Sequence, residues 1–384
     1  MPKDRPLKIL HLVGDREDAG GVLSVIRNLD TASDSEEWRH VVWVNEAYQE
    51  TRQPKLDYRQ SVSVIAESSR HLDLLWQSFP ACRELMDLCQ NEHFDVIHAH
   101  SRGTLLVALL FTLRTKRPVI YTNHNYANGK RLYQWAAKCP QMHTVVLTQN
   151  MARHYGLKVD NETVHQISAC FSDHYLDLPV AKRRTFNSSA SPLRLIGVGS
   201  VIGWKKWDLM LEGIRRLPRE LQHRIEFNIW GPTLQFPEAV QFAEKLKHTI
   251  DQNQLSSVVH LKGSTTEVVA KLSESDVFVL PSTNEPCSVA LMEALSLGLP
   301  VVVSRSGGNI DLVKEGCGLH FTPDDPESLK NVLERLITDP PEFRRPEAIR
   351  ETVLARTASQ VFNQYRSLYH RLAPVRSIRD SIQS

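Results

Sequence analysis

The chain has 384 residues, of which 23% are charged and 41% are hydrophobic, a balance that excludes a collagenous, low-complexity or disordered protein. Lys and Arg total 46 against 44 Asp and Glu, so the formal net charge of +2 gives no electrostatic basis for binding nucleic acid. Single hydrophobic cores stop growing near this length, and we therefore expect two domains.

Short β-branched runs alternate with helical patterns along the whole chain, which is typical of βαβ units and parallel sheets. The strands expected in the first half are Lys8–Val13, His40–Val44, Val62–Ile65, Asp95–Ala99, Pro118–Tyr121 and Thr144–Leu147. A polar stretch without periodicity, from Pro179 to Pro192, is predicted to be a linker. The strands expected after it are Leu193–Val198, Ile225–Trp230, Val258–Lys262, Val277–Leu280, Pro300–Val303 and Gly318–Phe321.

The pattern predicts an α/β protein with two Rossmann-like, doubly wound domains in tandem, at residues 1–185 and 186–358. Helical spacing resumes over Glu327–Leu336 and again from Ser359. We expect the last segment, 359–384, to form a helix that packs back on the first domain.

Cysteine usage and hydropathy indicate the compartment. The six cysteines form no Cys-x-x-Cys pair, which favours free thiols in a reducing environment over disulfides or structural zinc. The longest apolar run, 105–111, is too short to span a bilayer, and the apolar run 7–13 lacks a cleavage-like site after it. We expect a cytoplasmic protein, and a position at the inner surface of the membrane stays open.

One carboxylate stands inside an otherwise apolar helix of the second half. The helix is expected to begin at the capping residue Ser288 and to end at Gly298. Its charged residue, Glu293, would be costly to bury without a partner, so it either forms a core ion pair or meets a ligand. Glu285 lies ahead of the helix, in a loop after an apolar strand, and α/β sheets bind ligands at such loops.

This Glu-x7-Glu segment, followed by Ala-Leu-Ser-Leu-Gly-Leu-Pro, resembles the signature of the retaining GT-B glycosyltransferases of family 4. Other motifs follow the order and spacing of that family, namely Asp276-Val-Phe-Val-Leu-Pro-Ser282, Ser304-Arg-Ser-Gly-Gly308, Gly316-Cys-Gly318, Gly197-Val-Gly199 with Lys205, and Ile229-Trp-Gly-Pro232. The resemblance implies a GT-B fold whose two domains face a central cleft and close over a nucleotide-diphospho-sugar, with the donor mainly in the second domain.

The resemblance also implies roles for single residues. Glu285 would bind hydroxyls of the donor sugar, Glu293 the nucleotide ribose, and Lys205 the departing diphosphate. The family's arginine is replaced by Ser200, so that Lys206, Arg305 or a first-domain arginine compensates or catalysis is weakened. The expected donor-binding residues are Gly20, Gly21, Gly199, Ser200, Lys205, Lys206, Gly231, Pro232, Gly263, Ser264, Glu285, Pro286, Cys287, Ser288, Val289 and Glu293.

In the first domain, the pair Gly20-Gly21 suits a close approach of the backbone to donor or acceptor, and its pattern differs from the glycine motif of dinucleotide-binding enzymes. His124 matches the family histidine beside the reacting sugar, which makes it catalytic together with Glu285 and Lys205. His98 lies near the end of a predicted strand, His100 and Arg102 follow that strand, and all three are expected at the acceptor. Three histidines could also hold a metal, but no acidic residue or cysteine accompanies them at ligand spacing, so we expect none.

We therefore expect a retaining, metal-independent glycosyltransferase that needs no cofactor and moves a sugar from a UDP- or GDP-sugar to a glycan, lipid-linked or small-molecule acceptor. Glycan or glycolipid biosynthesis is the expected setting. Two alternatives stay open. The replacement at Ser200, together with Cys287-Ser288, suits a catalytically silent sugar-nucleotide-binding protein, and a nucleotide-sugar epimerase would have the same architecture.

Overall fold

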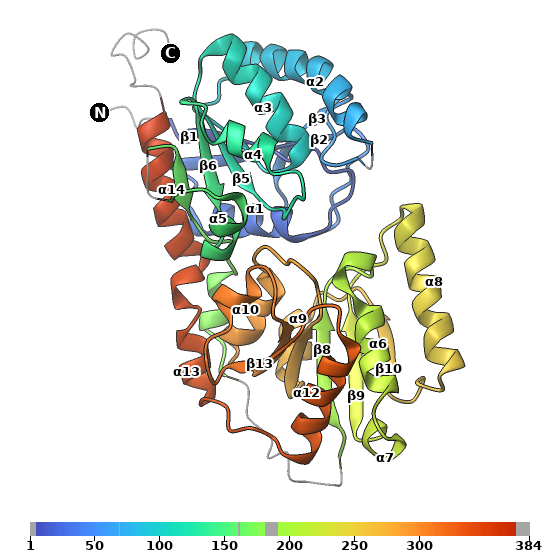
Figure 1. The fold of residues 1–384 in the computed structure, drawn as a ribbon. Coiled ribbons are helices and arrows are strands. Elements are labelled where there is room, and N and C mark those ends of the chain that lie inside the picture. The colour runs from blue at the N-terminus through green and yellow to red at the C-terminus, as the bar shows by residue number, and fades with distance from the viewer. Residues whose placement is uncertain (1–4, 69, 160–161, 181–190, 374–384) are drawn as a thin grey trace. The chain divides into compact units, whose positions relative to one another are not determined.

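A computed structural model describes residues 5–68, 70–159, 162–180 and 191–373 (Figure 1). The chain divides into two compact units, which we call unit 1 (1–168 and 358–384) and unit 2 (169–357). The sequence pattern predicts these boundaries at 185/186 and 358/359. Most of the stretch expected as a linker, 181–190, lies outside the described residues.

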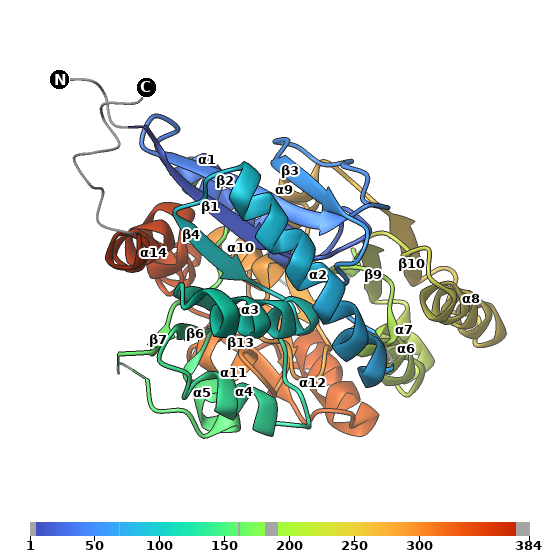
Figure 2. The same ribbon diagram turned by 90° about the horizontal axis from the view of Figure 1, so that it is seen from above.

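Unit 1 is built on a seven-stranded parallel sheet of order β3-β2-β1-β4-β5-β6-β7. Its strands are β1 (Leu7–Leu12), β2 (Trp38–Asn45), β3 (Asp57–Ser61), β4 (Val96–Ala99), β5 (Val119–Asn123), β6 (Met142–Val146) and β7 (Val164–Gln166). Its helices are α1 (Gly21–Ala32), α2 (His71–Asn91), α3 (Arg102–Thr115), α4 (Arg131–Ala136), α5 (Gln149–Tyr155) and α14 (Ala358–Leu372). The helices α2 and α3 pack together on one side of the sheet, and α14 packs with α1 (Figure 2).

The third strand of unit 1 differs from the prediction. The apolar run Val62–Ile65 lies in a loop outside any strand, and the side chain of Val62 is 70% exposed. The strand is instead Asp57–Ser61, whose residues are mostly polar. This strand lies at the edge of the sheet, where it pairs with β2. Central parallel strands are apolar because both of their faces are buried, and an edge strand is not under this requirement.

Unit 2 is built on a six-stranded parallel sheet of order β10-β9-β8-β11-β12-β13. Its strands are β8 (Leu193–Val198), β9 (Ile225–Trp230), β10 (Val259–Gly263), β11 (Val277–Leu280), β12 (Val301–Ser304) and β13 (Gly318–Phe321). Its helical elements are η1 (Asp173–Leu176), η2 (Gly203–Lys205), α6 (Trp207–Arg215), α7 (Arg219–Gln222), α8 (Pro237–Gln252), α9 (Val268–Ser273), α10 (Val289–Ser296), α11 (Asn309–Leu312), α12 (Pro326–Thr338), α13 (Pro346–Glu351) and η3 (Leu354–Arg356).

The two parallel sheets with their flanking helices confirm the predicted pair of Rossmann-like domains. In each sheet the strand order reverses once, between β1 and β4 in unit 1 and between β8 and β11 in unit 2. The loops that follow these strands meet at such a reversal, where doubly wound sheets bind their ligands. In unit 2, this topology predicts a ligand site at the segments that follow β8 and β11.

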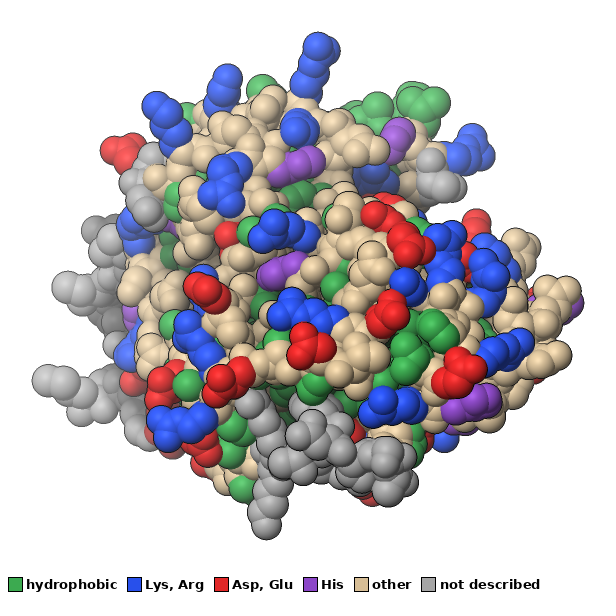
Figure 3. All heavy atoms as spheres, turned by 60° about the horizontal axis from the view of Figure 1, so that its bottom comes forward, with side chains coloured by type: hydrophobic (Ala, Val, Ile, Leu, Met, Phe, Trp, Pro, Cys, Tyr) green, Lys and Arg blue, Asp and Glu red, His purple; other side chains and the backbone are tan. Residues whose placement is uncertain are grey.

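The surface charge and the hydropathy of the helices agree with what the composition predicts. Figure 3 shows one face of the molecule, on which Lys and Arg side chains are interspersed with Asp and Glu. Among the described residues, no helix combines the length and the hydropathy needed to cross a membrane.

Candidate functional site

Two of the residues predicted to be catalytic meet at the strand reversal of unit 2. The Lys205 Nζ donates a hydrogen bond of 2.9 Å to the Glu285 Oε2, and the two residues are only 8% and 6% exposed. Lys205 belongs to η2, which follows β8, whereas Glu285 lies in the loop after β11. The same Nζ lies 4.2 Å from the centre of the Trp204 ring. The fold thus buries one cation and one carboxylate together at the carboxyl edge of the sheet.

The position of Lys205 depends on its neighbours in the β8–α6 connection. A Cβ atom on Gly199 would lie 3.3 Å from the Lys205 Cε, so the glycine leaves room for the aliphatic part of the lysine. The fully buried Trp207 donates from Nε1 to the Ser200 carbonyl (3.1 Å) and anchors the same turn. Lys206 has a left-handed backbone (φ 57°) and forms an ion pair of 2.8 Å with Asp324. Consecutive lysines therefore have different carboxylate partners.

The backbone of Glu285 is held by the turn between β12 and α11. The Gly308 N–H donates to the Glu285 carbonyl (2.7 Å), and the Asn284 N–H donates to the Ser306 Oγ (3.1 Å). A Cβ atom on Gly307 would lie 2.5 Å from the Glu285 carbonyl oxygen, so a larger residue there would displace the loop. The predicted motif 304–308 thus serves to position Glu285.

Arg305, considered above as a replacement for the missing arginine, is exposed. Its backbone N–H donates to the Phe321 carbonyl of β13 (2.8 Å). Its charge acts on His320, whose pKa it helps to lower after burial. The structure thus places the Arg305 side chain beside β13.

Helix α10 has the predicted ends. The Ser288 Oγ accepts a hydrogen bond from the Leu291 N–H (3.2 Å), which confirms the N-terminal cap, and Gly298 follows the helix with a left-handed φ of 77°. An N-terminus of this kind favours anions. Because Ser288 comes directly after the Glu285 loop, this helix end adjoins the buried Lys205–Glu285 pair in the chain.

Glu293, inside α10, is half-buried, and its partner is a hydroxyl. Burial raises the pKa of its carboxyl group to about 7, and a hydrogen bond with Tyr175 of η1 acts in the opposite direction. Within the described part of the chain, the partner of Glu293 is this hydroxyl and not a cation, so the core ion pair considered above does not form. The carboxylate is therefore poorly solvated and uncompensated by charge.

The glycines that end β9 and β10 bring three loops together. The Gly231 N–H donates to the Gly263 carbonyl, and the Val201 N–H donates to the Pro232 carbonyl, both at 2.8 Å. A Cβ atom on Gly231 would lie 2.0 Å from the Gly199 carbonyl oxygen, so only glycine permits this approach. The exposed Gly263 and its neighbour Ser264 complete the same edge.

In unit 1, the predicted glycine pair Gly20-Gly21 has free space beside it. Gly20 (φ 82°) caps α1 and Gly21 is its first residue, and a Cβ atom on either would meet nothing within 4 Å. Arg102, by contrast, forms an ion pair of 2.8 Å with Glu67, so its guanidinium is already engaged by a carboxylate.

The predicted histidines of unit 1 are not equally accessible. His98 is fully buried, and its ring nitrogens bond to the Thr122 Oγ1 (2.7 Å) and the Tyr369 hydroxyl of α14 (3.0 Å). His100 is 2% exposed, and its Nδ1 lies 3.2 Å from the Nε2 of the half-buried His124. Burial lowers the pKa of His124 to about 4 and holds those of His98 and His100 well below the usual value of a histidine, so all three are neutral at pH 7.

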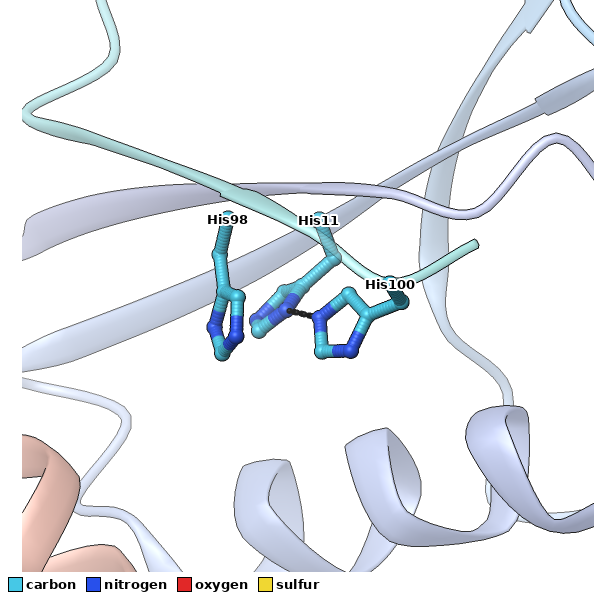
Figure 4. Close-up of side chains that lie close together, drawn as sticks. All are labelled: His11, His98 and His100. Atoms are coloured by element: carbon cyan, nitrogen blue, oxygen red, sulfur yellow. Dashed lines mark hydrogen bonds between the residues drawn. The ribbon is translucent and has the colours of Figure 1, made fainter. Parts of the chain in front are cut away.

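A metal would find three ring nitrogens within 4.8 Å of one another, on His11, His98 and His100 (Figure 4). The three rings are buried, and a hydrogen bond of 2.9 Å joins the His11 Nδ1 to the His100 Nε2. A metal would have to replace this bond and those of His98, so the ring nitrogens fit a hydrogen-bonded cluster better than an open coordination site.

Sequence reasoning missed Asp15, Tyr175 and two further histidines of unit 1, His11 and His40. Burial raises the pKa of Asp15 to about 7, the nearby Glu67 raises it further and Arg52 lowers it. Asp15 comes two residues after the first apolar run, and this place at the end of a strand was a usable signal. Tyr175 stands in a short helical turn without any pattern that would have singled it out.

Both parts of the chain match family models. Residues 19–169 match the model described as Glycosyltransferase Family 4, and residues 181–352 match the model described as Glycosyl transferases group 1. Sucrose-phosphate synthase from Thermosynechococcus elongatus has a similar structure, with a TM-score of 0.77 over 95% of this chain and 99% of that one, at 18% identity.

Two relatives illustrate the sequence similarity. WcaL of Salmonella typhimurium, named as a colanic acid biosynthesis glycosyltransferase, is 29% identical over 39% of this chain and 37% of its own length. An Escherichia coli enzyme, the UDP-Gal:alpha-D-GlcNAc-diphosphoundecaprenol alpha-1,3-galactosyltransferase, is 26% identical over 66% of this chain and 69% of its own length. The match thus spans little more than a third of WcaL. Because glycosyltransferase family models match both Rossmann-like units, the chain belongs to the GT-B glycosyltransferases.

Proposed function

We propose that this protein is a retaining glycosyltransferase that transfers a sugar from a UDP- or GDP-sugar to a glycan or a lipid-linked acceptor. The observation that carries the proposal is the buried Lys205–Glu285 pair at the strand reversal of unit 2. It adjoins the N-terminus of α10 in the chain, and the same helix holds the uncompensated carboxylate of Glu293.

In this proposal the leaving group explains the cation. Negative charge develops on the diphosphate as the glycosidic bond breaks, and fixed charges and N–H dipoles aimed at that charge lower the barrier. Lys205 and the first amides of α10 supply them, so no metal ion is needed. Glu285 accepts hydrogen bonds from sugar hydroxyls, and Glu293 binds the ribose in place of its bond to Tyr175.

Retention follows in this scheme from attack on the face that the diphosphate leaves. The acceptor oxygen forms its bond to the anomeric carbon while the bond to the diphosphate breaks, and the acceptor proton passes to the departing phosphate oxygen. No carboxylate of the enzyme is bonded to the sugar at any point. Burial of the Lys205–Glu285 pair supports this role, because charges act more strongly where water is excluded.

A transfer assay tests the proposed function. Purified protein is incubated with UDP-, GDP- and ADP-sugars and a set of polyprenyl-diphosphate and oligosaccharide acceptors, in EDTA and in magnesium. We expect one donor to be consumed and its sugar to reach an acceptor with the anomeric configuration of the donor retained, equally in both buffers. Loss of transfer in EDTA, restored by magnesium, would contradict the metal-free phosphate site. Donor binding without turnover would favour the silent binding protein, and conversion of the donor without an acceptor would favour the epimerase.

A lipid-linked acceptor has support in the surface of unit 1. Helix α2 exposes large apolar side chains at helical spacing, on Leu72 (64%), Leu75 (45%), Trp76 (70%) and Phe79 (45%). Such a stripe on one face of a helix is typical of a membrane-contacting surface, with aromatic side chains at the interface. We propose that this stripe holds the protein at the membrane that carries its acceptor.

The double variant Trp76→Ser/Phe79→Ser is expected to lose most of its co-sedimentation with vesicles that contain anionic phospholipid. Trp76 and Phe79 are the aromatic residues of the stripe. On membrane binding each would bury on the order of 100 Å² of apolar surface, and such burial contributes a binding free energy of about 25 cal/mol per Å². Trp204→Ser, which removes an exposed tryptophan of unit 2 (48% exposed), is the matched control. Equal binding of all three proteins would contradict the proposed contact.

A further inference from the structure

Four histidines of unit 1 are joined ring to ring across neighbouring strands. His40 lies in β2, His11 in β1, His100 directly after β4 and His124 directly after β5, in the spatial order of the sheet. The links are His40 Nδ1 to His11 Nε2 (2.8 Å), His11 Nδ1 to His100 Nε2 (2.9 Å, drawn in Figure 4) and His100 Nδ1 to His124 Nε2 (3.2 Å). We call these four residues the histidine chain.

The rings of the histidine chain are neutral at pH 7. Burial lowers the pKa of His40 and His124 to about 4, and it lowers those of His11 and His100 well below the usual value. A neutral imidazole carries one N–H and one lone pair, and each link needs one of each. Two proton arrangements satisfy all three links, with every ring protonated at Nδ1 or every ring protonated at Nε2. The tautomer of any one ring therefore fixes the other three.

The two ends of the histidine chain decide between these arrangements. The His40 Nε2 is buried, and no hydrogen-bond partner is recorded for it among the described residues. Phe362 of α14 packs against this ring with its centroid 6.0 Å away and offers neither oxygen nor nitrogen as acceptor. His124, at the other end, is half-buried, so water or a ligand can satisfy its second nitrogen. Buried N–H groups without an acceptor are rarer than buried acceptors without a donor, which favours protonation at Nδ1 throughout.

We propose that His40, His11 and His100 are positioning residues that hold His124 in its Nδ1–H tautomer. His124 then offers an N–H donor to an oxygen lone pair of the substrate, whether on a hydroxyl or on a phosphate. That His124 contacts substrate rests on the proposed glycosyltransferase function, whereas its tautomer depends on unit 1 alone.

His98 lies beside the histidine chain and is outside its links. Its ring centroid is 4.0 Å from that of His100, yet its nitrogens bond to Thr122 and Tyr369. It therefore contributes packing without contributing a proton to the chain of links. A metal bound by these histidines would need His98 as a ligand, whereas the hydrogen bonds of the histidine chain do not involve it.

The test is the nitrogen spectrum of full-length protein labelled with ¹⁵N-histidine at neutral pH, in which protonated and unprotonated ring nitrogens resonate far apart. Single His→Gln variants assign the signals. We expect His40, His11, His100 and His124 to be protonated at Nδ1. Different tautomers among the four rings would overturn the coupling, and protonation of His124 at Nε2 would overturn the stated direction.

Substitutions at the far end provide a matched pair. Asn, Asp and His all carry their first polar atom on Cγ, so His40→Asn keeps an N–H donor toward His11 while His40→Asp presents only acceptors. We expect His40→Asn to leave His124 protonated at Nδ1 and His40→Asp to move the proton to Nε2. If His40→Asp does not fold, His40→Leu removes the donor without adding charge, and a mixture of His124 tautomers is expected. An unchanged His124 signal in the folded variant would overturn the proposed coupling within the histidine chain.

Kinetics and metal content complete the test. We expect His40→Asp to bind UDP like His40→Asn but to lower kcat for sugar transfer about a hundredfold, the usual loss for one misdirected hydrogen-bond donor. A metal bound stoichiometrically to purified wild-type protein would overturn the proposed coupling, because it would take the nitrogens that form the central link. Absence of any transfer activity in wild type would contradict the proposed function and leave the tautomer result standing.

Discussion

Lys205→Ala is expected to lower kcat for sugar transfer by about 10²- to 10³-fold, the loss that usually follows removal of one group that stabilises developing charge. UDP affinity should fall less, because the lysine matters most as the diphosphate departs. Steady-state kinetics and calorimetric titration with UDP measure the two effects separately. A loss of UDP affinity with kcat unchanged would mean that Lys205 binds the ground state and the transition state alike.

Two controls separate chemistry from folding. Lys206→Ala removes the neighbouring charge, which pairs with Asp324 at the surface, and should keep near-wild-type turnover. Lys205→Ala also leaves Glu285 buried without its cation, which costs about 3–5 kcal/mol of stability. The double variant Lys205→Met/Glu285→Gln replaces the pair by uncharged side chains of similar size, so it should melt near the wild-type temperature and still fail to transfer sugar. Activity in this variant would exclude both residues from the mechanism.

Glu293→Gln is expected to weaken UDP binding by about 1.5–3 kcal/mol, because a neutral amide replaces a carboxylate that accepts hydrogen bonds from the ribose. Calorimetric titration of both proteins with UDP measures the loss. Tyr175→Phe is the matched control, since it removes the hydroxyl that bonds to Glu293 and keeps the carboxylate. Unchanged affinity in Glu293→Gln would exclude Glu293 from the nucleotide site.

The same substitution should stabilise the protein without ligand above pH 7. Because the folded-state pKa of Glu293 is about 7 and the ordinary pKa of a glutamate is 4.5, the unfolded chain releases this proton first as the pH rises. The free energy of unfolding of wild type therefore decreases by at most about 3 kcal/mol as the pH rises from about 4.5 to 7. Below pH 4.5 this contribution to stability is fully present. Gln cannot ionise, so Glu293→Gln should unfold at higher denaturant concentration than wild type at pH 8, with the difference shrinking at pH 4. A variant less stable than wild type at pH 8 would contradict the raised pKa.

Much of the fold was predictable because buried parallel strands have nearly continuous apolar sequences. Leu193–Val198, Ile225–Trp230 and Val277–Leu280 begin and end as predicted. The edge strand Asp57–Ser61 was missed for the converse reason, since pairing on one side leaves its residues half-exposed and polar. The short strand β7 likewise gave no signal.

The site was predictable only where a local motif identified it. The cap at Ser288 and the carboxylate of Glu293 were apparent from one helix, whereas the bond between Lys205 and Glu285 joins residues 80 positions apart and depends on the order of strands in the sheet. Tyr175 and the links of the histidine chain depend in the same way on which segments the fold brings together. Residue types near a strand end therefore suggest a site, and tertiary contacts select the partners.

Helix α14 has a consequence for how the protein is made. Its Tyr369 and Tyr365 hydroxyls bond to His98 and Thr122, and Phe362 packs on Trp38, so the last helix closes the layer over strands synthesised first. At usual rates of translation, the ribosome needs roughly 10–40 s to add the residues between position 168 and α14. During that time the nascent first unit exposes this face of its sheet while all of unit 2 emerges and can fold. Of the two units, the one whose strands are synthesised earlier is therefore completed later, because its final helix follows unit 2 in the sequence.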